Sequence, residues 1–129
     1  MQFHDFLGKV QHRAQFDNLE DALRATRATL NTLAERLNGN EPKDIASQLP
    51  GEIGQHLFPE SPGKGERFDV DTFIARVGER EGVPLNQATH HAQVVMGTLN
   101  EAVSAGEMSD VRGQLPNDYD LLFQKVWAD

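Results

Sequence analysis

A sequence repeat constrains the fold of this chain more than any other feature. When residues 18–50 are aligned with residues 84–116, which lie 66 positions later, ten of the 33 pairs are identical. Ordinary amino-acid composition gives about two identities by chance in such an alignment. A repeat of this length predicts two related structural units, and the repeated Gln-Leu-Pro sequence is its most specific part. The identical pairs are Leu19/Leu85, Ala22/Ala88, Thr32/Thr98, Leu33/Leu99, Glu35/Glu101, Glu41/Glu107, Asp44/Asp110, Gln48/Gln114, Leu49/Leu115 and Pro50/Pro116.

Both units have the residue spacing of a long amphipathic helix, because apolar residues recur every three or four positions. The first stripe predicts a helix over 19–37 that is capped by Asp17 or Asn18 and ends at Asn38-Gly39. The second predicts a helix over 85–103 that is opened by Pro84. The stripes consist of Leu19, Ala22, Leu23, Thr26, Leu30, Leu33 and Leu37, and of Leu85, Ala88, Ala92, Val95, Met96, Leu99 and Val103.

Shorter helices are expected around these two. Asp69 or Asp71 is expected to cap one of them and Ser109 another. The chain is expected to turn at the two Leu-Pro dipeptides, since the residue before a proline avoids the helical conformation. Neither alternating apolar runs nor hairpin dipeptides indicate strands. The short helices are predicted at 3–14, 41–48, 53–58, 68–82 and 109–114, and in a last segment with Tyr119, Leu122, Phe123 and Trp127.

These patterns predict an all-α fold, a single helical bundle of about eight helices built from two tandem four-helix pseudo-repeats. One domain is expected over residues 1–129, with pseudo-repeats at 3–58 and 68–126. Residues 59–67 are rich in Pro and Gly and have no apolar periodicity, so they are expected to form an exposed linker that folding constrains little.

The second unit contains a motif that resembles a known family. Its sequence is Gly106-Glu107-Met108-Ser109-Asp110-Val111-Arg112-Gly113-Gln114-Leu115-Pro116, followed by Leu122-Phe123. This motif resembles DUF2267, a bacterial domain of unknown function, and the resemblance extends from about Phe3 to Phe123. The first unit departs from the motif, with Asn40 in place of Gly and Pro42-Lys43 before Asp44. The resemblance implies a small helical bacterial protein and supplies no catalytic residues.

Composition excludes several functions. Twelve Lys and Arg against 20 Asp and Glu give a formal net charge of −8, which argues against non-specific binding to nucleic acid or to anionic membranes. The chain has no cysteine, so thiol chemistry, disulfides and cysteine-ligated metals are excluded. No apolar run is long enough for a signal peptide or a membrane span. We therefore expect a soluble cytoplasmic protein.

Three polar residues occur at matching positions of both units and are the candidate site residues. The local interpretation is that Glu and Asp lie near a helix start, while Gln satisfies backbone groups at the Leu-Pro corner. The alternative interpretation is a pair of related binding sites. We favour the local interpretation because duplicated units usually retain what folding needs. The six residues are Glu41, Asp44, Gln48, Glu107, Asp110 and Gln114.

Other polar residues are predicted to be structural. His90 and His91 lie off the apolar stripe and point about 100° apart on a helix, so they are expected to be exposed and not to share a metal. Asp118 is expected in the first turn of the last helix, where a carboxylate suits the helix dipole. Arg24, Arg27 and Arg36 are expected to form a basic helix face, with Glu20 paired to Arg24. No catalytic, cofactor-binding or metal-binding residue is predicted.

These observations predict a non-enzymatic protein-interaction or scaffold module, with a stress-related role included in that expectation. Its partner would be another protein or a second copy of itself. One alternative is a small-ligand or metal-dependent enzyme with a site in the groove between the two units, using Glu41, Glu107 or the histidines. A second alternative is a nucleic-acid-associated regulator that acts through Arg24 and Arg27.

The repeat predicts that Leu33 and Leu99 lie at the centre of the core, since each belongs to its stripe and occurs in both units. Replacing either with alanine is expected to lower the free energy of unfolding by about 2–5 kcal/mol, through lost apolar transfer energy and a residual cavity. Urea denaturation measures the loss, and a value below about 1 kcal/mol would mean that the stripes were assigned wrongly.

Overall fold

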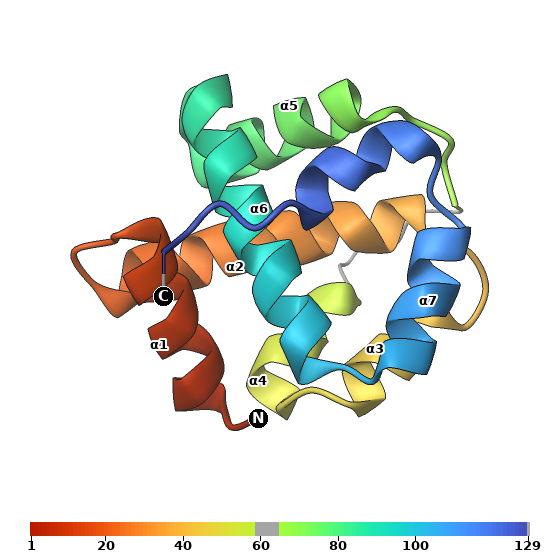
Figure 1. Cartoon of the computed structure of the whole chain (residues 1–129), viewed down its shortest axis with the longest axis horizontal. Helices are drawn as coiled ribbons and strands as arrows, with labels where there is room; N and C mark the ends of the chain where they lie inside the picture. The colour runs from red at the N-terminus through yellow and green to blue at the C-terminus, as the bar shows by residue number, and fades with distance from the viewer. Residues whose placement is uncertain (59–64, 129) are drawn as a thin grey trace.

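The computed structural model describes residues 1–58 and 65–128, and every regular element in this part of the chain is helical. The prediction of an all-α fold is therefore confirmed (Figure 1). None of the described helices is both long and apolar enough to cross a membrane. The α-helices are α1 (Phe3–Ala14), α2 (Leu19–Arg36), α3 (Glu41–Ser47), α4 (Gly51–Gly54), α5 (Val70–Glu81), α6 (Leu85–Ala102) and α7 (Ala105–Gly113), and the 3-10 helices are η1 (Gln55–Leu57) and η2 (Asn117–Phe123).

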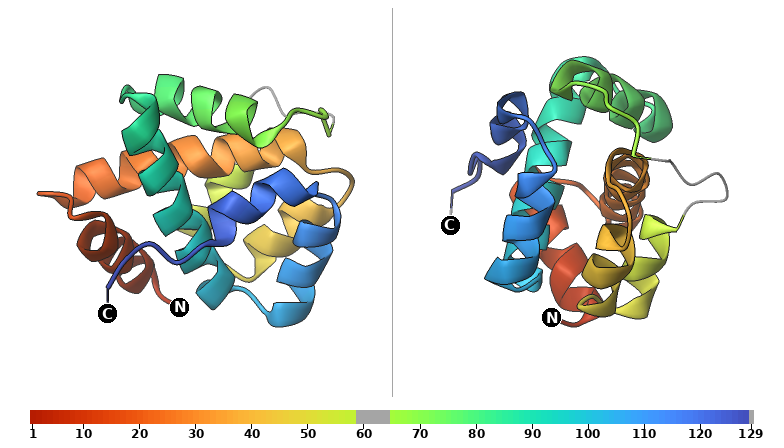
Figure 2. Two further views of the ribbon diagram at one scale, coloured as in Figure 1. Left: turned by 45° about the horizontal axis from the view of Figure 1, so that its top comes forward. Right: turned by 90° about the vertical axis from the view of Figure 1, so that its right-hand side faces the viewer.

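The long helices α2 and α6 cross at the centre of the molecule (Figures 1 and 2). α1 packs against both of them, and so does α5. α3 and α7 pack against each other at one end, and η2 packs against α6. The first helix of each predicted unit thus contacts the long helix of the other unit as well as its own.

The helix boundaries follow the offset of the sequence repeat. α2 and α6 have 18 residues each and begin 66 positions apart. α1 and α5 have 12 residues each, and both are followed by a residue in the left-handed conformation, Gln15 at φ 58° and Gly82 at φ 78°. The predicted caps are correct at two helices, where Asn18 accepts a hydrogen bond from Asp21 N and Asp69 accepts one from Thr72 N, each at 2.9 Å.

The predicted stripes form the core, with one exception in each long helix. Leu33 and Leu99 are fully buried, as are Phe6 and Phe73 from the two shorter helices. Leu19 and Leu85, however, are 44% and 61% exposed, so their assignment to the core was wrong. Each is the first residue of its helix, and helical side chains point back toward the N-terminus, so these two project past the helix end.

Polar contacts tie α1 to the long helix of the other unit. Arg13 on α1 donates hydrogen bonds to Thr98 and Glu101 on α6, each at 3.0 Å. Lys9 also contacts Glu101, at 3.4 Å. The hydrogen bond from Arg13 holds the pKa of Glu101 below its usual value, although burial opposes this shift.

A matching cluster ties α5 to α2. Arg80 donates to Thr32 at 2.7 Å and to Glu35 at 2.8 Å, and Arg76 contacts Glu35 at 3.2 Å. Burial raises the pKa of Glu35, but the hydrogen bonds and charges of Arg80 and Arg76 outweigh burial, so the pKa lies below its usual value. Every residue of this cluster stands 66 or 67 positions from its counterpart in the first one. The two units are therefore joined by the same contact in both directions.

Two helix assignments differ from the sequence predictions. α7 begins at Ala105 and is capped by Ser104, whose Oγ accepts from Glu107 N at 3.3 Å, so Ser109 lies inside the helix. The last helix is a 3-10 helix that ends at Phe123, because the backbone of Gln124 is extended, and Trp127 lies beyond it.

Most of the predicted linker, residues 59–64, lies outside the described residues. At its described end, Glu66 N donates to Glu35 O at 3.1 Å, and the Glu66 carboxylate contacts Arg76 at 3.0 Å. Glu66 is exposed as expected, but these contacts hold it to α2 and α5, so this end of the linker is constrained.

Two polar residues bind outside the helices on which they lie. Asp118 lies in the first turn of η2, as predicted. Asp118 accepts a hydrogen bond from Val70 N at 2.9 Å, so it caps α5 together with Asp69. Arg36 is only 6% exposed and donates to Phe68 O at 3.0 Å. The prediction of a basic face with Arg36 on it was therefore wrong.

His91 is buried, contrary to the expectation of an exposed residue. Its Nδ1 contacts Glu81 Oε2, and the side chains of His91 and Glu81 are 9% and 3% exposed. A buried carboxylate lowers its free energy by such pairing, which explains why a polar residue occupies this position. The aligned positions of the first unit hold Ala25 and Ala14. The first unit thus packs alanines where the second has a polar His–Glu pair.

The difference between the His91–Glu81 pair and the alanines of the first unit leads to a testable prediction. His91→Ala leaves a buried carboxylate without its partner and is expected to lower the free energy of unfolding by about 3–5 kcal/mol. Glu81→Ala is expected to cost about 1–3 kcal/mol. The double variant restores the alanine pair of the first unit and is expected to cost less than the sum of the single changes. Urea denaturation of the three variants measures the coupling, and additive losses would contradict it.

Candidate functional site

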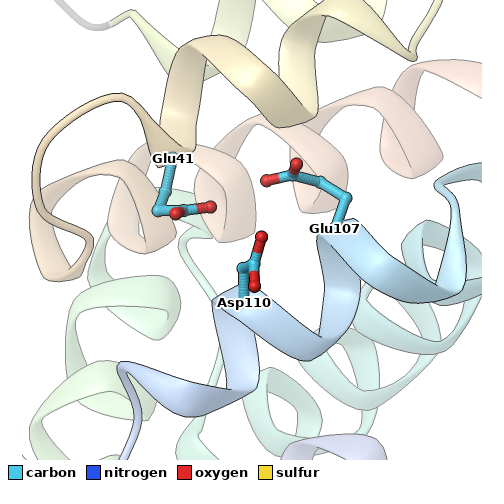
Figure 3. Close-up of side chains that lie close together, drawn as sticks. All are labelled: Glu41, Glu107 and Asp110. Atoms are coloured by element: carbon cyan, nitrogen blue, oxygen red, sulfur yellow. The ribbon is translucent and has the colours of Figure 1, made fainter.

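The candidate site is the seam where α3 of the first unit meets α7 of the second. Glu41 and Glu107 lie in the first turns of these helices, where a carboxylate interacts favourably with the helix dipole. The local sequence places them there. Gly39 takes the left-handed conformation at φ 63° just before α3, and Ser104 caps α7. The two helix starts therefore direct carboxylates toward each other across the seam (Figure 3).

Three carboxylates converge at the seam. Glu41, Glu107 and Asp110 each offer one oxygen, and these oxygens lie within 4.8 Å of one another (Figure 3). Oε2 of Glu41 and Oε1 of Glu107 are buried and have no hydrogen-bond partner in the part of the chain that the structure describes. Asp44 and Asp110 are exposed beside them. We name Glu41, Asp44, Glu107 and Asp110 the acidic seam.

The pKa of the Glu41 carboxyl is strongly raised by this environment. Burial raises the pKa of Glu41 to about 7, with further contributions from the neighbouring carboxylate of Glu107 and from the charges of Asp110 and Asp44. The Glu41 carboxyl therefore keeps its proton to a higher pH than an ordinary glutamate does. Such a proton can lie between Glu41 and Glu107 and reduce the repulsion between them.

Gln48 and Gln114 flank the acidic seam and each binds the opposite unit. Gln48 Oε1 accepts a hydrogen bond from Ser104 N at 2.7 Å, and Gln114 Oε1 accepts one from Asn38 N at 2.8 Å. Both glutamines satisfy backbone groups, but these lie at the entrance to the other unit's short helix and not at the Leu-Pro corner. The pair therefore fixes α3 and α7 relative to each other.

The acidic seam can accept a positive charge in two chemical forms. A hard divalent cation such as Mg²⁺ or Ca²⁺ binds carboxylate oxygens, and Glu41, Glu107 and Asp110 are the residues that could hold it. The ammonium or guanidinium group of a Lys or Arg side chain would form charge-assisted hydrogen bonds with the same oxygens. Either form would give a partner to the two buried oxygens.

Neither a histidine nor a residue of the basic helix face belongs to the described group of converging carboxylates. Burial lowers the pKa of His90, helped by the charge of His91, and burial lowers the pKa of His56, helped by Arg27. Arg24 pairs with Asp21 at 3.2 Å, one residue from the predicted partner Glu20.

Sequence reasoning missed a groove between α1 and α6. A cavity of about 770 Å³ there is lined by residues of both helices and of the segment after η2, among them His12, Arg13, His90 and Trp127. The sequence signal next to it is Gly97, which aligns with Asn31 of the first unit and lies against Trp127, because a glycine inside a helix often marks a close approach.

A family model described as "Uncharacterized conserved protein (DUF2267)" matches residues 3–122. The chain belongs to the DUF2267 family. A comparison with curated proteins finds no match. The DUF2267 motif that spans Gly106–Pro116 supplies Glu107, Asp110 and Gln114, so half of the candidate residues lie in it. In this DUF2267 protein the motif thus forms one side of the acidic seam.

The raised pKa of Glu41 predicts how stability depends on pH in metal-free buffer. The folded value is about 7 and the reference value is 4.5, so the folded protein binds more protons between these values than the unfolded chain. Stability contributed by Glu41 is complete below pH about 4.5 and is lost as the pH rises through about 7. Glu41→Gln is therefore expected to raise the free energy of unfolding at pH 8 by on the order of 1 kcal/mol.

Urea denaturation at pH 5 and pH 8 measures this effect. The exposed Glu52, on α4, provides the control, and Glu52→Gln is expected to leave the pH dependence unchanged. A Glu41→Gln variant that is less stable than wild type at pH 8, or equally dependent on pH, would contradict the assignment.

Proposed function

We propose that this DUF2267 protein is a non-enzymatic helical interaction module that binds another protein through the acidic seam. The proposal rests on the convergence of carboxylates from both units, within 4.8 Å, with two buried oxygens that have no partner among the described residues. A buried oxygen without a hydrogen-bond donor raises the free energy of the unbound protein. A partner that supplies donors to these oxygens removes this penalty, so it binds more tightly. The seam is therefore better suited to a complex than to the free protein.

The chemistry of the seam favours a basic partner segment. The chain carries a net charge of −8, which attracts positively charged proteins and raises their association rate. The exposed carboxylates of Asp44 and Asp110 lie beside the buried oxygens and can bind a second basic group. Arg is the preferred residue for such a site, because its planar fork donates to two oxygens at once.

A divalent cation is the second candidate ligand. Calcium binds oxygens at about 2.3–2.6 Å, so two oxygens on opposite sides of the ion stand about 5 Å apart. The spacing of 4.8 Å or less in the acidic seam is compatible with this geometry. Cation binding here corresponds to the metal-dependent enzyme that the sequence analysis gave as an alternative function. The nucleic-acid alternative has less support, because Arg24 is paired with Asp21 and Arg36 is buried.

Protein binding is tested with a double variant of the seam. Glu41→Gln/Glu107→Gln removes two charges while keeping similar side-chain size. An octa-arginine peptide is expected to bind the wild-type chain at least about tenfold more tightly than this variant, measured by calorimetry at low salt. The double variant Asp71→Asn/Glu79→Gln, which replaces two exposed carboxylates of α5, is the control matched for net charge. Equal affinity for wild type and the double variant would contradict the proposal.

Cation binding is tested with the same wild-type and variant proteins in the absence of the peptide. If Mg²⁺ or Ca²⁺ raises the Tm of wild type and leaves that of Glu41→Gln/Glu107→Gln unchanged, the seam binds metal and the second candidate is supported. A peptide effect without a cation effect supports the protein partner alone.

A further inference from the structure

A cavity of about 480 Å³ lies where three parts of the chain meet. These are the C-terminal end of α2, the described segment that leads into α5, and the corner between α7 and η2 (Figure 1). We name it the arginine cavity, because Arg36 and Arg67 line it together with a single acidic residue of the described chain, Asp69. The four carboxylates of the acidic seam are not among its described lining residues.

Arg36 is a buried cation without an acidic partner. It is 6% exposed, and its guanidinium forms no ion pair with a carboxylate of the described residues. Its neighbours are neutral: Nε–H donates to Phe68 O at 3.0 Å, and the Tyr119 ring centroid lies 5.4 Å from the guanidinium carbon. A carbonyl oxygen and a ring face offset less of the free-energy cost of burying a charge than an anion does. A guanidinium also has further N–H groups that can donate to such an anion.

The second unit has no arginine at the corresponding position. Arg36 is the last residue of α2, and it aligns with Ala102, the last residue of α6. A long helix of this fold can therefore end without a cation. A basic residue does suit the C-terminal end of a helix dipole, but an exposed cation satisfies the dipole equally well. Neither helix formation nor the dipole thus explains why this guanidinium is buried.

The other polar groups of the cavity favour a negative ligand. Arg67 is exposed, forms no ion pair with a described residue, and adds a second positive charge. Gln114 accepts a hydrogen bond from Asn38 N through Oε1, which leaves its amide nitrogen as a donor. The carboxylate of Asp69 serves α5, where Oδ1 accepts from Thr72 N at 2.9 Å. The described lining is therefore net positive in a chain of net charge −8.

We propose that the arginine cavity binds a small anionic ligand through a carboxylate or phosphate group, with Arg36 as the buried contact and Arg67 at the rim. A guanidinium donates to two oxygens of such a group at once, and the anion gives the buried charge the partner that it lacks. The cavity volume of about 480 Å³ lies within the range of small-ligand sites, about 300–1,000 Å³. The acidic seam takes positive groups and this cavity negative ones, so the inference goes beyond the proposed function and can fail while that function stands.

The Nε–H resonance of Arg36 reports binding in the full chain by nitrogen NMR, because Nε–H is held by Phe68 O. Its absence from the spectrum of Arg36→Lys assigns it. Inorganic phosphate and succinate are titrated separately, with ionic strength held constant by sodium chloride. At least one of them is expected to shift this resonance saturably. A shift with phosphate alone identifies a phosphate ligand, and a shift with succinate a carboxylate ligand.

A variant of the exposed arginine tests the site without disturbing the core. Arg67→Gln is expected to weaken binding of the shifting anion by about three- to tenfold. Arg27→Gln removes the same charge from an exposed position of α2 that does not line the cavity, and it is expected to leave the affinity unchanged. The proposal is overturned if neither anion shifts the resonance saturably, or if Arg67→Gln binds as tightly as wild type.

Discussion

The rest of the structure depends on the crossed attachment of each unit's first helix to the other unit's long helix. Arg13 holds Glu101, and Arg80 holds Glu35, with a threonine hydroxyl completing each contact. These bonds join α1 to α6 and α5 to α2, so the apolar faces of both long helices are covered only when both units are present. This mutual dependence supports the interpretation of one domain with a shared core.

The sequence predicts those features that depend on residues close together in the chain. The apolar stripes and the caps at Asn18 and Asp69 need only a few neighbouring residues, and apart from Leu19 and Leu85 they are correct. The polar contacts between the units were not predicted. Asp118, Gln48 and Gln114 accept hydrogen bonds from backbone groups 48, 56 and 76 positions away. Local propensity contains no information on such partners, so these residues were assigned to their own units.

The errors at His91 and Trp127 have different physical causes. His91 was judged exposed because it is polar and lies off the stripe, but pairing with Glu81 lets a polar residue occupy a buried position. Trp127 was assigned to a helix because its spacing from Phe123 fits one. The helix ends before Gln124, and the Trp127 indole lies against Gly97. No packing role was predicted for Gly97 from the sequence.

The acidic seam follows from the repeat by a geometric argument. When two related units face each other with reciprocal contacts, a residue near the centre of the interface meets its own counterpart. An acidic residue there meets another acidic residue, so Glu41 meets Glu107 and their repulsion is unavoidable. Retention for folding accounts for Gln48 and Gln114, which hold the two short helices together, whereas the carboxylates leave two buried oxygens unpaired. A positive ligand or a shared proton removes that cost, which makes the seam the part of the fold whose stability responds most to what binds it.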